Sequence, residues 1–152
     1  MLDNIVEDVE FSKMMQRNLQ DMIVHFFKKD QNFGILCKIE EVSFNPELPE
    51  DISNSFNQLT LFFLAGYTFE TARIEGEFLV FEAGFGADNI GSVVSVPLLS
   101  IMQIIVDETP VMINLSSYKA QEERVVKEVD NGGVKNSMNS FLSNPENSKF
   151  LK

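Results

Sequence analysis

The sequence predicts a mainly β, α+β domain, in which one amphipathic N-terminal helix is followed by a run of short strands, one short helix and a C-terminal tail. Apolar residues recur at helical spacing early in the chain, and short segments rich in β-branched and aromatic residues then alternate with turn-forming residues. Both patterns are lost after Leu115. A chain of 152 residues can bury one core. We therefore expect a folded domain over residues 1–115 and a tail over residues 116–152.

The N-terminal helix is expected from Glu10 to Lys29, where apolar residues are spaced by three and four positions. The apolar stripe is broad and rich in methionine, so it predicts packing against the β-structure and also against a second copy of the helix. Packing within one domain is the alternative. His25 is the only histidine of the chain, and beside Phe26 and Phe27 it is expected to be a packing or surface residue. The residues expected at a dimer interface are Phe11, Met15, Leu19, Met22 and Phe26.

The first half of the strand region contains three expected elements. A strand from Gly34 to Phe44 would place Ile35, Cys37 and Ile39 on one face, and the proline-containing segment Asn45–Ser55 would end it as a loop. Leu59–Tyr67 is apolar on both faces, which is typical of a central strand covered on both sides.

The second half begins with a short edge strand in ETARIEG, with a turn at Glu75 and Gly76 before a strand over Phe78–Phe85. A loop over Gly86–Gly91 and a strand over Ser92–Val96 follow. Pro97 would open a short helix with Leu98, Ile101, Met102 and Ile105 at helical spacing, ended by Thr109 and Pro110 before a last strand, Val111–Leu115.

Composition argues against several classes of function. The formal net charge of −11 disfavours nucleic acid as a partner, because phosphate binding depends on Lys and Arg. The negative charge lies in residues 1–115, where 6 basic and 18 acidic residues give −12, whereas residues 116–152 have 6 and 5, giving +1. No apolar run is long enough to cross a membrane, and the acidic N-terminus does not resemble a secretory signal, so we expect a cytoplasmic protein.

The search for catalytic and metal-binding motifs is negative. The chain has no phosphate-binding glycine loop, no GxSxG, no HExxH and no CxxC, and its single cysteine, Cys37, falls inside an apolar strand, where an inert buried thiol is expected. We therefore expect no enzyme activity, no metal and no cofactor.

The tail contains two segments of interest. Ala120–Val129 is compatible with a helix that Asn131, Gly132 and Gly133 would stop. The chain ends in an apolar pair between two cations, Lys149, Phe150, Leu151 and Lys152, which is either chance composition or a docking peptide.

Leu79–Ala87 reads LVFEAGFGA, Val94–Ile104 reads VSVPLLSIMQI, and Glu108 follows. The segment from Phe81 to Ile104 resembles the SspB family of protease-delivery adaptors. That family has a segment of the form xVxFxARFGG, a short loop, and then QVSVPLAAVLAIYAxE, with its Glu at the place of Glu108. Outside this segment, the likeness over residues 15–115 is one of element order and spacing.

The resemblance implies a bent, Sm-like β-barrel that dimerises through its N-terminal helix and binds unstructured peptide tags, notably the ssrA tag, for delivery to the AAA+ protease ClpXP. An extended peptide in a groove gains main-chain hydrogen bonds, and side-chain pockets add selectivity. By position, the tail residues Lys149–Lys152 would correspond to the family's docking motif for the unfoldase ClpX. The expected peptide-binding residues are Ala83, Gly84, Phe85, Gly86, Ala87, Val94, Ser95 and Val96.

The chain departs from the family pattern at Gly84, where the family has Arg, in a longer loop between Gly86 and Val94, and in a shorter, nearly neutral tail. The sequence thus predicts a homodimeric, non-enzymatic adaptor for peptide tags. The alternative is a small acidic export chaperone, which would hold an unfolded client on its helix and the exposed faces of its strands.

Overall fold

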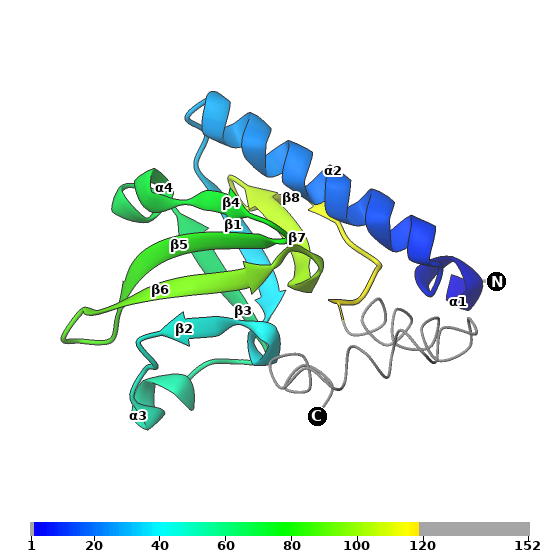
Figure 1. Ribbon diagram of the computed structural model, residues 1–152. Coiled ribbons are helices and arrows are strands. Elements are labelled where there is room, and N and C mark those ends of the chain that lie inside the picture. The colour runs from blue at the N-terminus through cyan, green and yellow to red at the C-terminus, as the bar shows by residue number, and fades with distance from the viewer. Residues whose placement is uncertain (1, 119–152) are drawn as a thin grey trace, which may run out of the picture. The chain divides into compact units, whose positions relative to one another are not determined.

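A computed structural model describes residues 2–118, which belong to one compact unit that ends at Tyr118 (Figure 1). The expected helix over 120–129 and the C-terminal residues Lys149–Lys152 lie outside the described residues.

The N-terminal region contains a short helix that the sequence did not predict, α1 (Leu2–Val6), and the predicted long helix, α2 (Val9–Lys28). The Asp8 side chain accepts a hydrogen bond from the Phe11 N–H at 3.2 Å and so caps the start of α2. At the other end the Lys29 N–H donates to the His25 carbonyl oxygen. The prediction of a helix over 10–29 is therefore confirmed.

The strands form two antiparallel sheets of four strands each, which confirms the α+β class. The first sheet has the order β3-β1-β7-β8, with bounds Leu59–Leu64, Phe33–Lys38, Ile101–Val106 and Thr109–Ile113. The second sheet has the order β2-β6-β5-β4, with bounds Ser43–Asn45, Ile90–Pro97, Phe78–Phe85 and Arg73–Glu75.

Two bends carry the chain from one sheet to the other. The predicted strand over Gly34–Phe44 is divided into β1 and β2 by a 3-10 turn, η1 (Ile39–Glu41), and β6 is divided from β7 by a second turn, η2 (Leu98–Ser100). At the far sides of the sheets, β3 and β8 do not pair with β2 or β4. The two sheets are therefore not closed into a barrel, which corrects the expectation of a bent β-barrel.

The short helix expected after Pro97 is also wrong, because the segment after η2 is the strand β7. In β7, Ile101 and Ile104 are buried, and the residues between them are half-buried. This period of three arises because the pairing with β1 shifts: Leu36 lies opposite Gln103, and the next residue, Cys37, lies opposite Ile101. A β-bulge in β7 therefore imitates the apolar spacing of a helix.

The β7–β8 connection is a hairpin turn rather than a helix end. Asp107 and Glu108 have φ of 49° and 67°, the left-handed region that two-residue hairpin turns require. The strand expected over Val111–Leu115 begins earlier, at Thr109.

The strand β3 does not have the position that its sequence predicts. It ends at Leu64 rather than Tyr67, because Gly66 has φ 57° and Tyr67–Thr71 forms the short helix α4. It lies at the edge of the first sheet and buries Phe62 and Leu64, whereas Leu59, Leu61 and Phe63 are exposed. A central, doubly covered strand is therefore not observed. The loop expected over Asn45–Ser55 contains a further short helix, α3 (Glu50–Ser53).

The core lies between the inner faces of the two sheets and beneath α2. Its fully buried side chains come from α2, from both sheets and from η2, and include Leu19, Ile23, Phe33, Ile35, Leu79, Phe81, Val94, Val96, Leu98, Leu99, Ile101 and Ile104. Burial of this apolar surface is the main favourable contribution to folding.

Candidate functional site

The β5–β6 hairpin brings together the two segments that resemble the adaptor family. In its register Phe81 lies opposite Val94, Ala83 opposite Ser92, and Gly84 opposite Gly91. Successive side chains of a strand point to opposite faces, so these residues divide into an inward and an outward set.

Several of the predicted peptide-binding residues belong to the inward set. Val94 and Val96 are fully buried, and Ala83 and Phe85 pack against the core. The ring of Phe85 lies 5.6 Å from that of Phe44 and 6.0 Å from that of Phe56, between ring centroids. Ser95 is half-buried and lies opposite Ser43 of β2. The valines and Phe85 therefore support the hairpin from inside.

The hairpin also lines a cavity of about 320 Å³, called here the hairpin cavity. Two of the predicted residues, Ala83 and Gly84, line it. The other lining residues, which the sequence interpretation did not identify, are Asn45, Pro46, Tyr67, Glu82, Asn89, Gly91, Ser92 and Val93. The strand alternation starting from Phe81 could have placed Glu82 and Gly84 on the outward face, whereas nothing in the sequence placed Tyr67 or Asn89 there.

Glycine at position 84 is explained by Asn89. A Cβ atom on Gly84 would lie 2.6 Å from the Cγ atom of Asn89, and still closer to its Oδ1 atom. Asn89 has φ 51°, and its N–H donates to the Gly86 carbonyl oxygen at 3.1 Å, so the hairpin loop holds this side chain over β5. An arginine at position 84, as in the adaptor family, would require Asn89 to move.

The remaining predicted residues, Gly86 and Ala87, belong to the loop and do not line the cavity. Gly86 has φ 74°, and a Cβ atom there would lie 2.9 Å from the Cδ1 atom of Ile52 in α3. The loop tip is therefore held by contact with α3.

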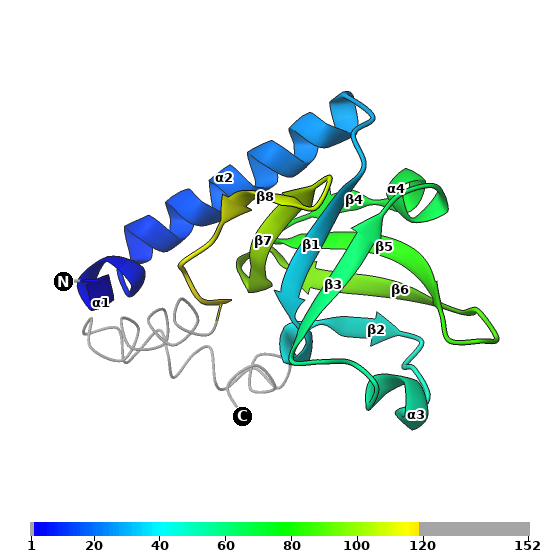
Figure 2. The same ribbon diagram turned by 180° about the vertical axis from the view of Figure 1, so that it is seen from behind.

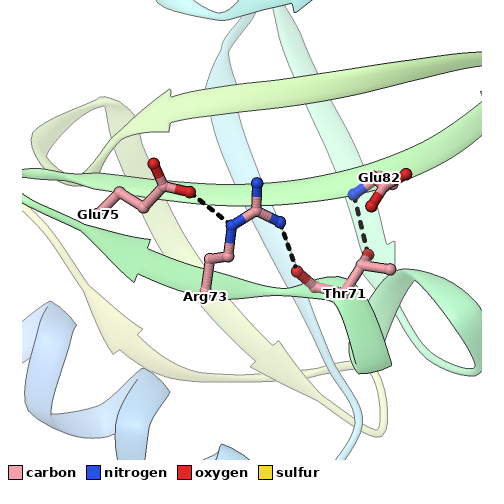
Figure 3. Close-up of polar contacts among 4 residues, drawn as sticks. All are labelled: Thr71, Arg73, Glu75 and Glu82. Carbon is pink, nitrogen blue, oxygen red and sulfur yellow. Dashed lines mark hydrogen bonds and ion pairs between the residues drawn. The ribbon is translucent and has the colours of Figure 1, made fainter.

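Polar groups at the cavity come from α4 and β5. The Tyr67 hydroxyl donates to Oε1 of Glu82 at 3.2 Å, and the Glu82 N–H donates to Oγ1 of Thr71 at 3.0 Å. Arg73 is paired with Glu75 and also donates to the Thr71 carbonyl oxygen at 2.9 Å (Figure 3). The hydrogen bond to Glu82, and secondly its negative charge, raise the pKa of Tyr67. Arg73 forms its ion pair with Glu75 and not with Glu82. The Glu82 carboxylate therefore gives the cavity a negative group beside the exposed ring of Tyr67.

One edge of β5 near this cavity is only partly paired with a strand, and the helix α4 contacts β5 there. The strand β4 pairs with β5 only from Phe78 to Val80, and no described strand pairs with the remainder of that edge. The Glu82 N–H points to this side, where it meets Thr71. Backbone groups alternate in direction along an antiparallel strand, so the N–H and C=O of the exposed Gly84 also point to the open edge.

Cys37 is a free, fully buried cysteine of β1. Burial, and secondly the nearby charge of Glu41, raise its pKa to about 12, and the thiol donates to the Thr60 carbonyl oxygen at 3.6 Å. The predicted inert, buried thiol is confirmed. Within residues 2–118, no group of three or more His, Cys, Asp or Glu side chains is placed to hold a metal ion.

The helix residues predicted to form a dimer interface face largely into the core of their own domain. Leu19 is fully buried, and Met15, Met22 and Phe26 are half-buried against the core. Phe11 is half-buried, and the exposed His25 sits on the outer side of α2. Across residues 2–118, no helix is both long and apolar enough to span a membrane.

No protein-family model matches this sequence, and no curated protein matches it.

Proposed function

We propose that the protein is a non-enzymatic adaptor that binds extended degradation-tag peptides, such as the ssrA tag, in the hairpin cavity and delivers tagged proteins to a ClpXP-type protease. The observation that carries the proposal is the cavity beside the open edge of β5. It lies on the hairpin whose sequence resembles the SspB adaptors.

The cavity has the features that an extended peptide requires. The absence of a side chain at Gly91 leaves open space in the cavity, whereas the Asn89 side chain lies over Gly84. A peptide backbone would therefore approach the Gly84 N–H and C=O from the edge of β5. The Tyr67 ring, Val93 and Pro46 offer apolar contacts, and the carboxylate of Glu82 favours a cationic or hydrogen-bond-donating group.

We also propose that the strands have an opened Sm-like arrangement, and the bends at η1 and η2 support this. Delivery would use a second contact, between the C-terminal residues Lys149–Lys152 and the unfoldase. Two weak contacts on one chain suffice, because the tether raises the effective concentration of the cargo at the protease.

The proposal is tested with Gly91→Leu, because a Cβ atom at Gly91 would meet no atom within 4 Å. The new side chain would enter the hairpin cavity without disturbing the fold. We expect it to abolish saturable binding of a fluorescent ssrA-type peptide, measured by anisotropy, and to abolish the acceleration of ClpXP degradation of a tagged reporter.

Ser95→Leu is the matched control, since Ser95 lies on the same strand and does not line the cavity. It should leave peptide affinity unchanged. Equal affinity of the wild-type protein and the Gly91→Leu variant would place the peptide elsewhere. The absence of any saturable binding by the wild-type protein would refute the adaptor function.

Removal of residues 149–152 separates delivery from capture. Peptide affinity should be retained, while degradation of the tagged reporter should fall to the rate without adaptor. The export-chaperone alternative makes the opposite forecast for the wild-type protein, namely one co-purifying client and no affinity for free tag peptides.

A further inference from the structure

The strand β3 (LTLFFL) has an uncharged, proline-free edge. Its outward side chains Leu59, Leu61 and Phe63 are 48%, 51% and 60% exposed. The opposite side chains of the strand enter the core, so β3 has the doubly apolar pattern of a strand that is covered on both faces. In the described chain nothing covers the outward face of β3, which lies on the near side in Figure 2.

The other three edge strands carry the features by which proteins prevent unwanted strand pairing. The strand β4 has three residues, of which Arg73 and Glu75 form an ion pair. The strand β2 also has three residues and is followed directly by Pro46. The strand β8 contains Pro110 and an irregular register. Only β3, six residues long, lacks such protection among the edges that the structure describes.

The backbone of β3 is oriented for pairing. The Ile39 N–H donates to the Gln58 carbonyl oxygen at 2.9 Å, so the Gln58 carbonyl points toward β1. By alternation, the backbone groups of Thr60, Phe62 and Leu64 point toward β1 as well. The N–H and C=O groups of Leu59, Leu61 and Phe63 therefore point to the open edge.

We propose that β3 pairs with β3 of a second copy of this chain, antiparallel and about a two-fold axis at Leu61. A two-fold interface requires a self-complementary surface. Centring on Leu61 places Leu61 opposite its own counterpart and Leu59 opposite the partner's Phe63. Each of these residues then exchanges backbone hydrogen bonds with the residue opposite, and their exposed side chains pack in apolar cross-strand pairs. The first sheets of the two copies become one continuous sheet.

Charge also favours β3 for self-association. Residues 1–115 carry a net charge of −12, from 6 basic and 18 acidic residues, so most contacts between two copies would bring carboxylates together. The residues of β3 include no carboxylate, and their neighbour across the sheet at Leu59 is Lys38. This strand is thus a place where two acidic domains can approach with little repulsion.

The proposal is tested by the mass of the full-length protein in sedimentation velocity, over a concentration series up to about 100 µM, where a complex of micromolar Kd is saturated. We expect a dimer for the wild-type chain. Leu61→Lys should weaken dimerisation by at least about 100-fold, because two like charges would then face each other across the axis.

Leu61→Pro is a second variant, which removes the outward-pointing N–H together with the leucine side chain and breaks no hydrogen bond to β1, a change that an edge strand tolerates. It should also be monomeric, and its unfolding transition should remain cooperative. The matched control is Met14→Lys, which adds the same charge at a 57% exposed position of α2 and should stay dimeric.

Three results would overturn the proposal. The first is a wild-type protein that stays monomeric at the highest concentration. This result would overturn the proposal even if the monomer bound an extended apolar peptide along β3. The second is a dimer that persists in both Leu61 variants. The third is a dimer that only Met14→Lys dissociates, which would place the interface on α2.

Discussion

The side chain of Asn89 rests over β5 because residue 84 is glycine, since a Cβ atom there would lie 2.6 Å from the Cγ atom of Asn89. The contact joins the hairpin loop to the strand, and both residues line the hairpin cavity. The shape of the cavity therefore depends on this pair.

The first prediction concerns that pair. Gly84→Ala should lower the free energy of unfolding by about 1 kcal/mol, because the Asn89 side chain must leave its rotamer to make room. In an Asn89→Gly background, which suits the positive φ of residue 89, the same change should cost little. Urea unfolding of the four proteins of this double-mutant cycle measures the coupling, and a coupling near zero would show that Asn89 does not constrain Gly84.

The loop tip gives a second prediction. Gly86 and Gly76 have similar positive φ values, 74° and 60°, but only Gly86 would bring a Cβ atom against a neighbour, Ile52. Both alanine variants should lose about 1 kcal/mol from backbone strain. Gly86→Ala should lose more, because Ile52 is in the way.

Chemical denaturation of both glycine variants, with and without Ile52→Ala, measures the additional cost at Gly86. This additional cost should disappear in the Ile52→Ala background. Equal losses at the two glycines in the presence of Ile52 would argue that α3 does not hold the loop.

Phe85 gives a third prediction, because the sequence suggests a peptide-binding role and the structure places its ring against Phe44, Phe56 and Phe62. Phe85→Ala should lower the free energy of unfolding by about 2 to 3 kcal/mol, since it removes a half-buried ring from an aromatic cluster. Peptide affinity per folded molecule should change little. A large loss of peptide affinity with unchanged stability would instead show that Phe85 contacts the peptide.

The sequence predicts α2 and β5 well, because their patterns are regular and are bounded by turn-forming residues. The bounds of β5, Phe78–Phe85, agree with the expectation from alternation and the turn at Gly76. The segment after Pro97 has the spacing of a helix but forms a strand, because the bulge in β7 gives buried isoleucines at a spacing of three. Local periodicity cannot distinguish a bulged strand from a helix.

The candidate site was only partly predictable. The resemblance to the adaptor family points to the β5–β6 hairpin. It selects peptide-binding residues by their position in the chain, however, and so includes both the buried Val94 and the exposed Gly84. Tyr67 is brought to the cavity by α4, and Asn45 and Pro46 by β2 and its loop, from distant parts of the sequence. These contacts arise from the tertiary fold and leave no local signal.

The last prediction concerns pH and Cys37. Burial raises the pKa of its thiol from 9.0 to about 12, so above pH 9 the unfolded state releases a proton that the folded state retains. The folded state then binds more protons than the unfolded state, and the free energy of unfolding must fall as pH rises. The stabilising contribution is complete below pH 9 and is lost progressively toward pH 12.

Cys37→Ala removes this titration, because alanine has no ionisable group. The free energy of unfolding of the wild-type protein, minus that of the variant, should therefore decrease by about 1.4 kcal/mol for each pH unit above 9. Urea unfolding at several pH values between 8 and about 10.5 measures this difference, and the subtraction cancels the titration of the tyrosines and lysines. A difference that does not depend on pH would contradict the prediction, because the thiol would then ionise as readily in the folded protein as in the unfolded chain. Burial of Cys37 in the core is the reason to expect otherwise.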